Sequence, residues 1–178
     1  QVRRMITQRL YVTTFKEEIE ARRLGPAGTE IFGRIYKRIV PFPFDGFSTA
    51  KGNAADSCQE LTLELLQGKL DFNGVLAKPV KTKNRAIAVL QKTWGSFNRA
   101  GQVSRKPQHP VTRSIIEKWD EILQSEQKQF VVAEVLRQMC MPPYGANIAS
   151  AGLLLGLFIA PRIDNLIAIR DGQQYAVT

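Results

Sequence analysis

The chain has 178 residues, of which 44% are hydrophobic and 23% charged, and its formal net charge is +9. This length suffices for one ordinary domain or two small ones with a real core, and the composition excludes a disordered or collagen-like chain. We expect a piece of a longer cytoplasmic protein, because the sequence starts at Gln1 without a signal peptide and ends within a strand-like pattern.

The positive charge is unevenly distributed along the sequence. Residues 1–106 contain 19 Lys and Arg against 9 Asp and Glu, whereas residues 107–178 contain 6 against 7. A polyanion would therefore be attracted to the first part. The polar, proline-bearing stretch 101–110 lies near the change in charge and predicts a boundary there or, alternatively, an extended arm. We expect a basic helical subdomain over residues 1–106 and a second subdomain over residues 107–178.

The first forty residues predict short elements separated by turns. Residues 2–15 mix basic and β-branched side chains and are compatible with a strand or a helix end, while residues 16–24 favour a helix. Gly25-Pro26-Ala27-Gly28 predicts a turn, after which Thr29 is a suitable N-cap for a helix through Ile39.

The next segment predicts a loop and a helix. Residues 41–47 hold two prolines and three phenylalanines, which indicates a loop held on the core or, alternatively, an aromatic patch that binds peptides. Residues 54–66 predict a helix with Leu61, Leu65 and Leu66 facing inward. Residues 48–52 lack the glycine, lysine and Ser/Thr arrangement of a Walker A loop, so they do not predict a nucleotide site.

A basic run, residues 78–85, precedes a short apolar helix at residues 86–90. The run is compatible with a solvated loop or with a patch that contacts phosphates. Further on, Thr112 or Ser114 can cap a helix through Leu123. The buried stripe predicted for this helix consists of Ile115, Ile116, Trp119, Ile122 and Leu123.

The last fifty residues predict helix, turn, helix and hairpin. The apolar face of the first helix would consist of Val131, Val132, Val135, Leu136 and Met139. Pro142, Pro143 and Gly145 end that helix, and Asn147 or Ser150 caps a second one that runs to Ala160. Asp171-Gly172 favours a type I′ turn between strands 166–170 and 174–178. The fold class predicted is therefore mainly α, a helical domain with a C-terminal winged-helix-like unit.

The second helix of this unit has no charged residue between Ala151 and Ala160. A recognition helix presents polar and basic side chains to DNA, so this one is expected to pack in a core or on a partner. Gly152 and Gly156 are one turn apart and permit close approach of another element. At roughly ten residues the helix is too short to cross a bilayer, which needs about twenty.

No arrangement of residues predicts catalysis, a metal or a cofactor. The only histidine, His109, lies in the stretch predicted to be a linker, and Cys58 and Cys140 are far apart in apolar helical patterns. None of these residues has the spacing of a zinc site or a catalytic triad, and the cysteines are expected to be reduced and buried.

The turn Met141-Pro142-Pro143-Tyr144-Gly145-Ala146-Asn147, with the apolar helix and the hairpin that follow, resembles a segment of large P-loop ATPases of bacterial phage-defence systems of the BREX type. The resemblance covers about residues 45–178, and the turn and helix are its specific part. It implies a fragment downstream of the nucleotide-binding core of a multidomain ATPase. Because the chain has no Walker A or Walker B pattern, the resemblance assigns ATP binding to none of its residues.

The function predicted is a non-catalytic module that contacts nucleic acid, with DNA favoured, through phosphates. The residues expected to make these contacts are Lys78, Lys81, Lys83, Arg85, Arg99, Arg105 and Lys106, with Arg170 and Arg162 in a secondary role. The alternative is a structural module that binds an acidic protein surface or the rest of its parent protein. A membrane partner is not expected.

Overall fold

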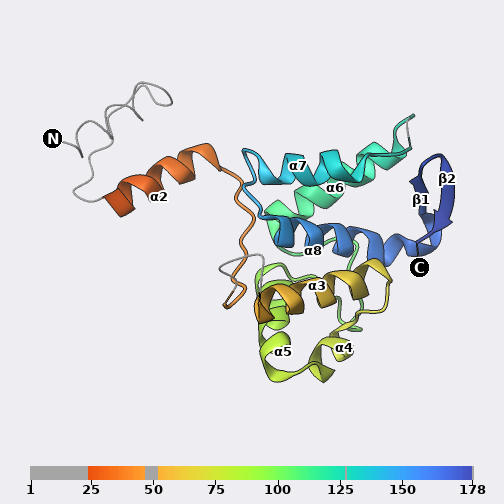
Figure 1. Ribbon diagram of the computed structural model, residues 1–178, viewed down its shortest axis with the longest axis horizontal. Coiled ribbons are helices and arrows are strands. Elements are labelled where there is room, and N and C mark those ends of the chain that lie inside the picture. The colour runs from red at the N-terminus through yellow and green to blue at the C-terminus, as the bar shows by residue number, and fades with distance from the viewer. Residues whose placement is uncertain (1–23, 47–51, 127, 178) are drawn as a thin grey trace.

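The computed structural model describes residues 24–46, 52–126 and 128–177. The chain before residue 24, with the element predicted at residues 2–15 and nearly all of the helix predicted at residues 16–24, lies outside them. Within the described residues the protein has seven α-helices, a π-helix, a 3-10 helix and one two-stranded antiparallel sheet (Figure 1). The elements are α2 (Leu24–Ile35), α3 (Asn53–Leu66), α4 (Phe72–Ala77), α5 (Val80–Ala86), η1 (Ile87–Thr93), α6 (Pro110–Gln124), α7 (Val132–Cys140), α8 (Ile148–Ile159), η2 (Ala160–Asn165), β1 (Ile167–Arg170) and β2 (Gln173–Ala176).

Helix α8 lies at the centre of the core, between α3 on one side and α6 and α7 on the other (Figure 1). Most of its side chains are buried, among them Leu153, Leu154, Leu157 and Phe158. The prediction of a packing helix is therefore confirmed. The glycines allow the close approach to α3, because a Cβ at Gly156 would lie only 2.7 Å from the Cβ of Leu65.

The segment between α2 and α3 is held on this core, as the loop prediction for residues 41–47 requires. The backbone N–H of Val40 donates to the carbonyl of Tyr144 (3.1 Å), and the indole Nε1 of Trp94 donates to the carbonyl of Pro41 (2.7 Å). Phe44 is buried, and its ring stacks on Phe42 with 5.2 Å between ring centroids. Helix α2 itself projects away from the rest of the described chain (Figure 1).

The same core receives side chains from both sides of the predicted subdomain boundary. Leu61 and Trp94 precede residue 106, Ile115 and Phe158 follow it, and all four are fully or almost fully buried in one cluster. The two predicted subdomains therefore share one core, and the division into residues 1–106 and 107–178 stays a prediction.

Two predictions of turns and loops are wrong. Gly25-Pro26-Ala27-Gly28 lies inside α2, because proline is tolerated in the first turn of a helix, where its missing N–H has no partner to lose. That helix ends at Ile35 rather than Ile39. The basic run at residues 78–85 is not a loop, because most of it forms α5, which buries Thr82, Arg85 and Ala86 at helical spacing.

The helices after residue 106 follow the predicted pattern with shifted boundaries. Helix α6 begins at Pro110, and Ile115, Ile116 and Trp119 are buried as predicted. Helix α7 buries Val135 and Met139, but Val131 and Val132 are exposed, so the predicted apolar face of α7 is too wide.

The last part of the chain confirms the predicted order of helix, turn, helix and hairpin. The side chain of Asn147 caps α8 by accepting a hydrogen bond from the N–H of Ser150 (2.8 Å). Asp171 and Gly172 both have positive φ, as a type I′ turn requires, and Ile167 pairs with Ala176. With η2, α8 forms a helical run, Ile148–Asn165, of 18 residues and mean hydropathy 1.2, long and apolar enough to span a membrane; half of it is buried in the core.

Candidate nucleic-acid interface

Arg85, one of the predicted phosphate contacts, is buried in the protein. Its Nε donates to the carbonyl of Asp45 (2.7 Å), and its Nη1 donates to the carbonyl of Asn53 (3.1 Å) and to the hydroxyl of Ser57 (3.2 Å). The guanidinium also lies over the ring of Phe44, 5.8 Å from its centroid. Arg85 therefore joins α5 to α3 and to the preceding loop, and it is not free to contact a phosphate.

Lys78 is occupied by two carboxylates of α3. Its ammonium donates to Glu60 (2.6 Å) and also to Glu64, one turn further along the helix. Burial lowers the pKa of Lys78, but the hydrogen bonds to both carboxylates outweigh this and raise it above its ordinary value. The ion pairs therefore contribute at neutral pH and are lost only as the pH rises through this raised pKa.

The two arginines with a secondary role are also separate from the others. Arg162 is buried, and its Nε and Nη2 donate to the two carboxylate oxygens of Asp120 (2.7 and 2.5 Å). Arg170 lies at the tip of the hairpin, almost fully exposed, with its Nε 3.6 Å from the carboxylate of Asp171. Neither arginine lies near the other predicted contacts in the sequence.

A long acid-free segment contains the remaining basic residues. Between Asp71 and Glu117 the sequence has nine Lys and Arg and no Asp or Glu. The absence of acidic residues from this segment is the signal that identifies Lys92 and Arg113 as further candidates, which the sequence reasoning missed. Both are exposed.

Helix α5 presents two of these cations. Lys81 is exposed and Lys83 is half-buried, and they flank the buried Thr82. Because successive helical residues are about 100° apart, the two side chains project about 200° from each other. They therefore lie on opposite sides of the helix and do not face one phosphate together.

The first part of the predicted boundary stretch, residues 101–110, belongs to a folded loop, residues 96–106, which we call the basic loop. Phe97 and Val103 form an antiparallel bridge, and the N–H of Ser104 donates to the carbonyl of Ser96 (2.8 Å). At the tip, the Oδ1 of Asn98 accepts from the N–H groups of Ala100 (2.9 Å) and Gln102 (3.0 Å). The backbone of the basic loop is therefore held by hydrogen bonds within the loop.

The basic loop presents Arg99 at its tip and Arg105 and Lys106 at its base. All three are exposed, and none forms an ion pair with a described residue. Arg113, at the start of α6, closes the base by donating from Nε to the carbonyl of Pro107 (2.8 Å). The structure thus brings three predicted contacts together on one ordered loop.

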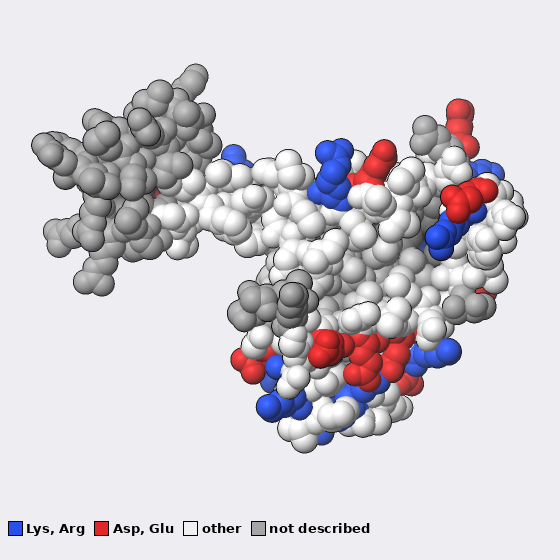
Figure 2. All heavy atoms as spheres, viewed as in Figure 1, with Lys and Arg blue, Asp and Glu red and all other residues white. Residues whose placement is uncertain are grey.

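The face of the protein drawn in Figure 2 carries charges of both signs. Lys and Arg atoms alternate with Asp and Glu atoms over its lower part, which α3, α4 and α5 form in Figure 1. Lys78 forms its ion pairs with Glu60 and Glu64 of α3, so its positive charge is not available to a polyanion. Among the predicted contacts, the basic loop is therefore the better candidate for a polyanion.

The side chains that could support catalysis do not form a site within the described residues. No group of three or more His, Cys, Asp and Glu could hold a metal there. Both cysteines are free, and burial raises the pKa of Cys58 to about 11, which disfavours the reactive thiolate. His109 precedes α6, half-buried, and its Nδ1 is buried without a hydrogen-bond partner among these residues.

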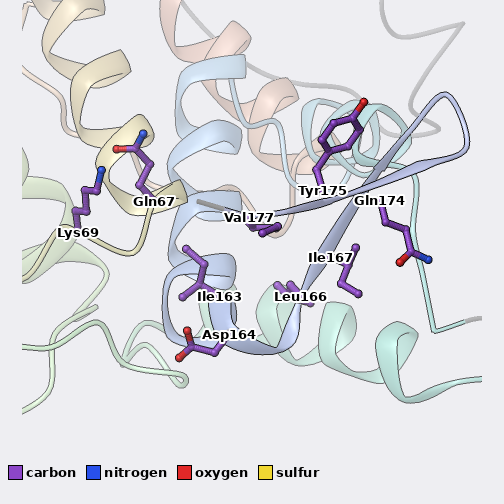
Figure 3. Close-up of a pocket in the computed structure, with 10 residues that line it drawn as sticks. Gln67, Lys69, Ile163, Asp164, Leu166, Ile167, Gln174, Tyr175 and Val177 are labelled. Atoms are coloured by element: carbon purple, nitrogen blue, oxygen red, sulfur yellow. The ribbon is translucent and has the colours of Figure 1, made fainter.

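A cleft of about 710 Å³ separates the hairpin from η2 and the end of α3 (Figure 3). Its walls are mainly apolar, with Gln67 and Lys69 on the side of α3. The apolar residues that line it are Ile163, Leu166, Ile167, Tyr175, Ala176 and Val177. The cleft is open to solvent, and its ionisable lining residues are Lys69, Asp164 and Tyr175.

Comparison with known proteins finds no family model, no curated protein and no solved structure that matches this chain. The resemblance to phage-defence ATPases therefore stays a prediction, and the functional argument depends on the residues themselves.

Proposed function

We propose that the chain is a non-catalytic module that binds nucleic acid through its phosphates, using the basic loop and its neighbours. The proposed contacts are Arg99, Arg105 and Lys106, with Lys81, Lys83, Lys92 and Arg113 adding to the local positive charge. The observation that carries the proposal is the acid-free segment between Asp71 and Glu117, in which seven of the nine basic residues remain after the paired Lys78 and the buried Arg85 are set aside. A winged-helix-like role for α6 to the hairpin and a parent ATPase of the phage-defence type are further parts of this proposal.

The physical basis is electrostatic. Each Lys or Arg that neutralises a phosphate releases a condensed counterion, which favours binding at low salt and makes the affinity fall as salt rises. The basic loop holds its cations on a backbone fixed by the Asn98 turn and the bridge of Phe97 with Val103, so little ordering is needed on binding. Apart from Lys78, no cation of the segment forms an ion pair with a described residue.

Charge reversal of the basic loop should weaken DNA binding and reduce its salt dependence. For the triple variant Arg99→Glu, Arg105→Glu, Lys106→Glu, we expect the slope of log affinity against log salt to fall in magnitude by roughly 2 to 3, because about one counterion is released per phosphate contact. Fluorescence anisotropy of a labelled duplex, titrated at several salt concentrations, measures this slope.

The matched control reverses three exposed cations outside the segment, Lys37→Glu, Lys118→Glu and Arg137→Glu. This variant has the same net charge as the loop variant, and we expect it to retain most of the slope. Equal losses in both variants would show that net charge alone attracts DNA. Absence of binding by the unmodified chain at low salt would reject the proposal.

The exposed hairpin favours a second candidate function, a protein-interaction module. Ile167 and Ile169 lie on one face of β1 and are 62% and 59% exposed. Among the described residues, no further strand pairs with either edge of the hairpin. Backbone groups on the outer edges of such a hairpin can pair with a strand of another protein.

The variant Ile167→Thr, Ile169→Thr should leave the melting temperature nearly unchanged, because these side chains bury little surface in the chain itself. If the hairpin is an interface, the variant should lower association with the partner in sedimentation or pull-down measurements. A fall in melting temperature of more than a few degrees would mean that the isoleucines stabilise the fold instead.

A further inference from the structure

The aromatic side chains of the acid-free segment are all turned inward. Trp94 is fully buried and its Nε1 is bonded to the carbonyl of Pro41, and Phe97 is 5% exposed. Phe72 is half-buried, and its ring lies 5.5 Å from that of Phe97. The segment has no other Phe, Tyr or Trp, so its surface offers cations without an exposed aromatic ring.

This combination discriminates between forms of nucleic acid. Proteins that bind single strands add base stacking on exposed aromatic rings to their phosphate contacts, and each stacked base contributes roughly 5- to 100-fold in affinity. A duplex keeps its bases stacked inside and presents phosphates at regular spacing and higher charge density, so cations alone suffice to bind it.

The basic loop is also held in one conformation at its tip. The N–H of Phe72 donates to the carbonyl of Gly101 (2.8 Å), which anchors the tip to the start of α4. Gly101 has φ of 79° and lies close to Phe72, since a Cβ there would be 3.3 Å from the Cβ of Phe72. Cations on a fixed backbone suit the regular phosphates of a duplex better than those of a flexible strand.

From these observations we infer that the partner of the basic loop is double-stranded nucleic acid, contacted on its phosphate backbone, and not a single strand. This inference rests on the proposed function and specifies its partner. The contacts carry no sequence information, because phosphates are common to all sequences.

The test compares the full chain on a labelled 20-base-pair DNA duplex and on a 20-nucleotide single strand of mixed sequence, at equal low salt. We expect about tenfold or tighter binding to the duplex. Equal or tighter binding to the single strand would overturn the inference and leave the proposed function intact. Absence of binding to both would reject the proposed function itself.

A second variant tests whether stacking is what the surface lacks. Gln102→Trp places an aromatic ring at an exposed position beside the tip of the basic loop. We expect it to raise single-strand affinity about fivefold or more and to change duplex affinity little. Unchanged single-strand affinity in this variant would contradict the stacking argument and overturn the inference.

Discussion

Replacing Asp120 by alanine should lower the free energy of unfolding by about 3 kcal/mol, because it leaves the guanidinium of Arg162 charged and without its partner. The Arg162 side chain is 9% exposed, so water cannot easily replace the lost carboxylate. The Nη1 of Arg162 already donates to the carbonyl of Phe158 (2.9 Å). The Cζ of Arg162 lies 4.5 Å from the centroid of the Phe158 ring. Urea unfolding followed by circular dichroism gives the change in free energy.

The reciprocal variant separates this mechanism from simple loss of a contact. Arg162→Met should cost less, about 1 kcal/mol, because Asp120 is 32% exposed and can be hydrated. The methionine also keeps an apolar chain against Phe158. The double variant Asp120→Ala, Arg162→Met should therefore be more stable than Asp120→Ala alone. Strictly additive costs in the three variants would contradict the proposed coupling.

The elements that the sequence predicted well are those specified by neighbouring residues. Asn147 caps α8 through the N–H three residues ahead, and Asp171-Gly172 forms the hairpin turn by its own backbone preference. The absence of charge between Ala151 and Ala160 similarly indicated a buried helix. In each case the residues that specify the element belong to it or lie next to it in the sequence.

The side chains that the sequence misassigned have partners far away in the chain. Arg85 is bonded to Asp45, 40 residues earlier, and Arg162 to Asp120, 42 residues earlier. Counting charges treats each arginine as solvated, whereas only the packing of distant segments shows which guanidinium is enclosed. For the same reason, the sequence of the basic run at residues 78–85 is compatible with a solvated loop, whereas in the structure most of the run forms α5, which packs on α3.

The order of the basic loop also depends on contacts between distant segments, which the sequence does not show. The polar, proline-bearing stretch 101–110, which overlaps this loop, predicts a boundary, and the local turn at Asn98 gives no reason for a fixed orientation. The orientation comes from Phe97, which packs on Phe72 of α4, and from the bond between Phe72 and Gly101. The candidates Arg99, Arg105 and Lys106 could be identified from the sequence, but their presence on one ordered loop could not.

Gly156, where α8 lies close against α3, is the position of the second large expected effect. Alanine at this position should lower the free energy of unfolding by about 2 to 3 kcal/mol, as overpacking of a core does. Its Cβ would lie 2.7 Å from the Cβ of Leu65 and 3.5 Å from the carbonyl oxygen of Thr62. Neither atom belongs to the free end of a side chain, so the two helices must separate. Thermal and urea unfolding measure the loss.

Gly152, one turn earlier on α8, is the matched control, because both glycines lie against α3. A Cβ at Gly152 would meet the methyl group of Thr62 at 3.5 Å, which is ordinary van der Waals contact. Alanine there should stabilise the protein by about 0.5 to 1 kcal/mol, because alanine loses less backbone freedom in a helix than glycine does. The same substitution is therefore expected to change the free energy of unfolding in opposite directions at two positions four residues apart. If both variants were stabilised, the distance between α3 and α8 would have to be larger than the structure gives.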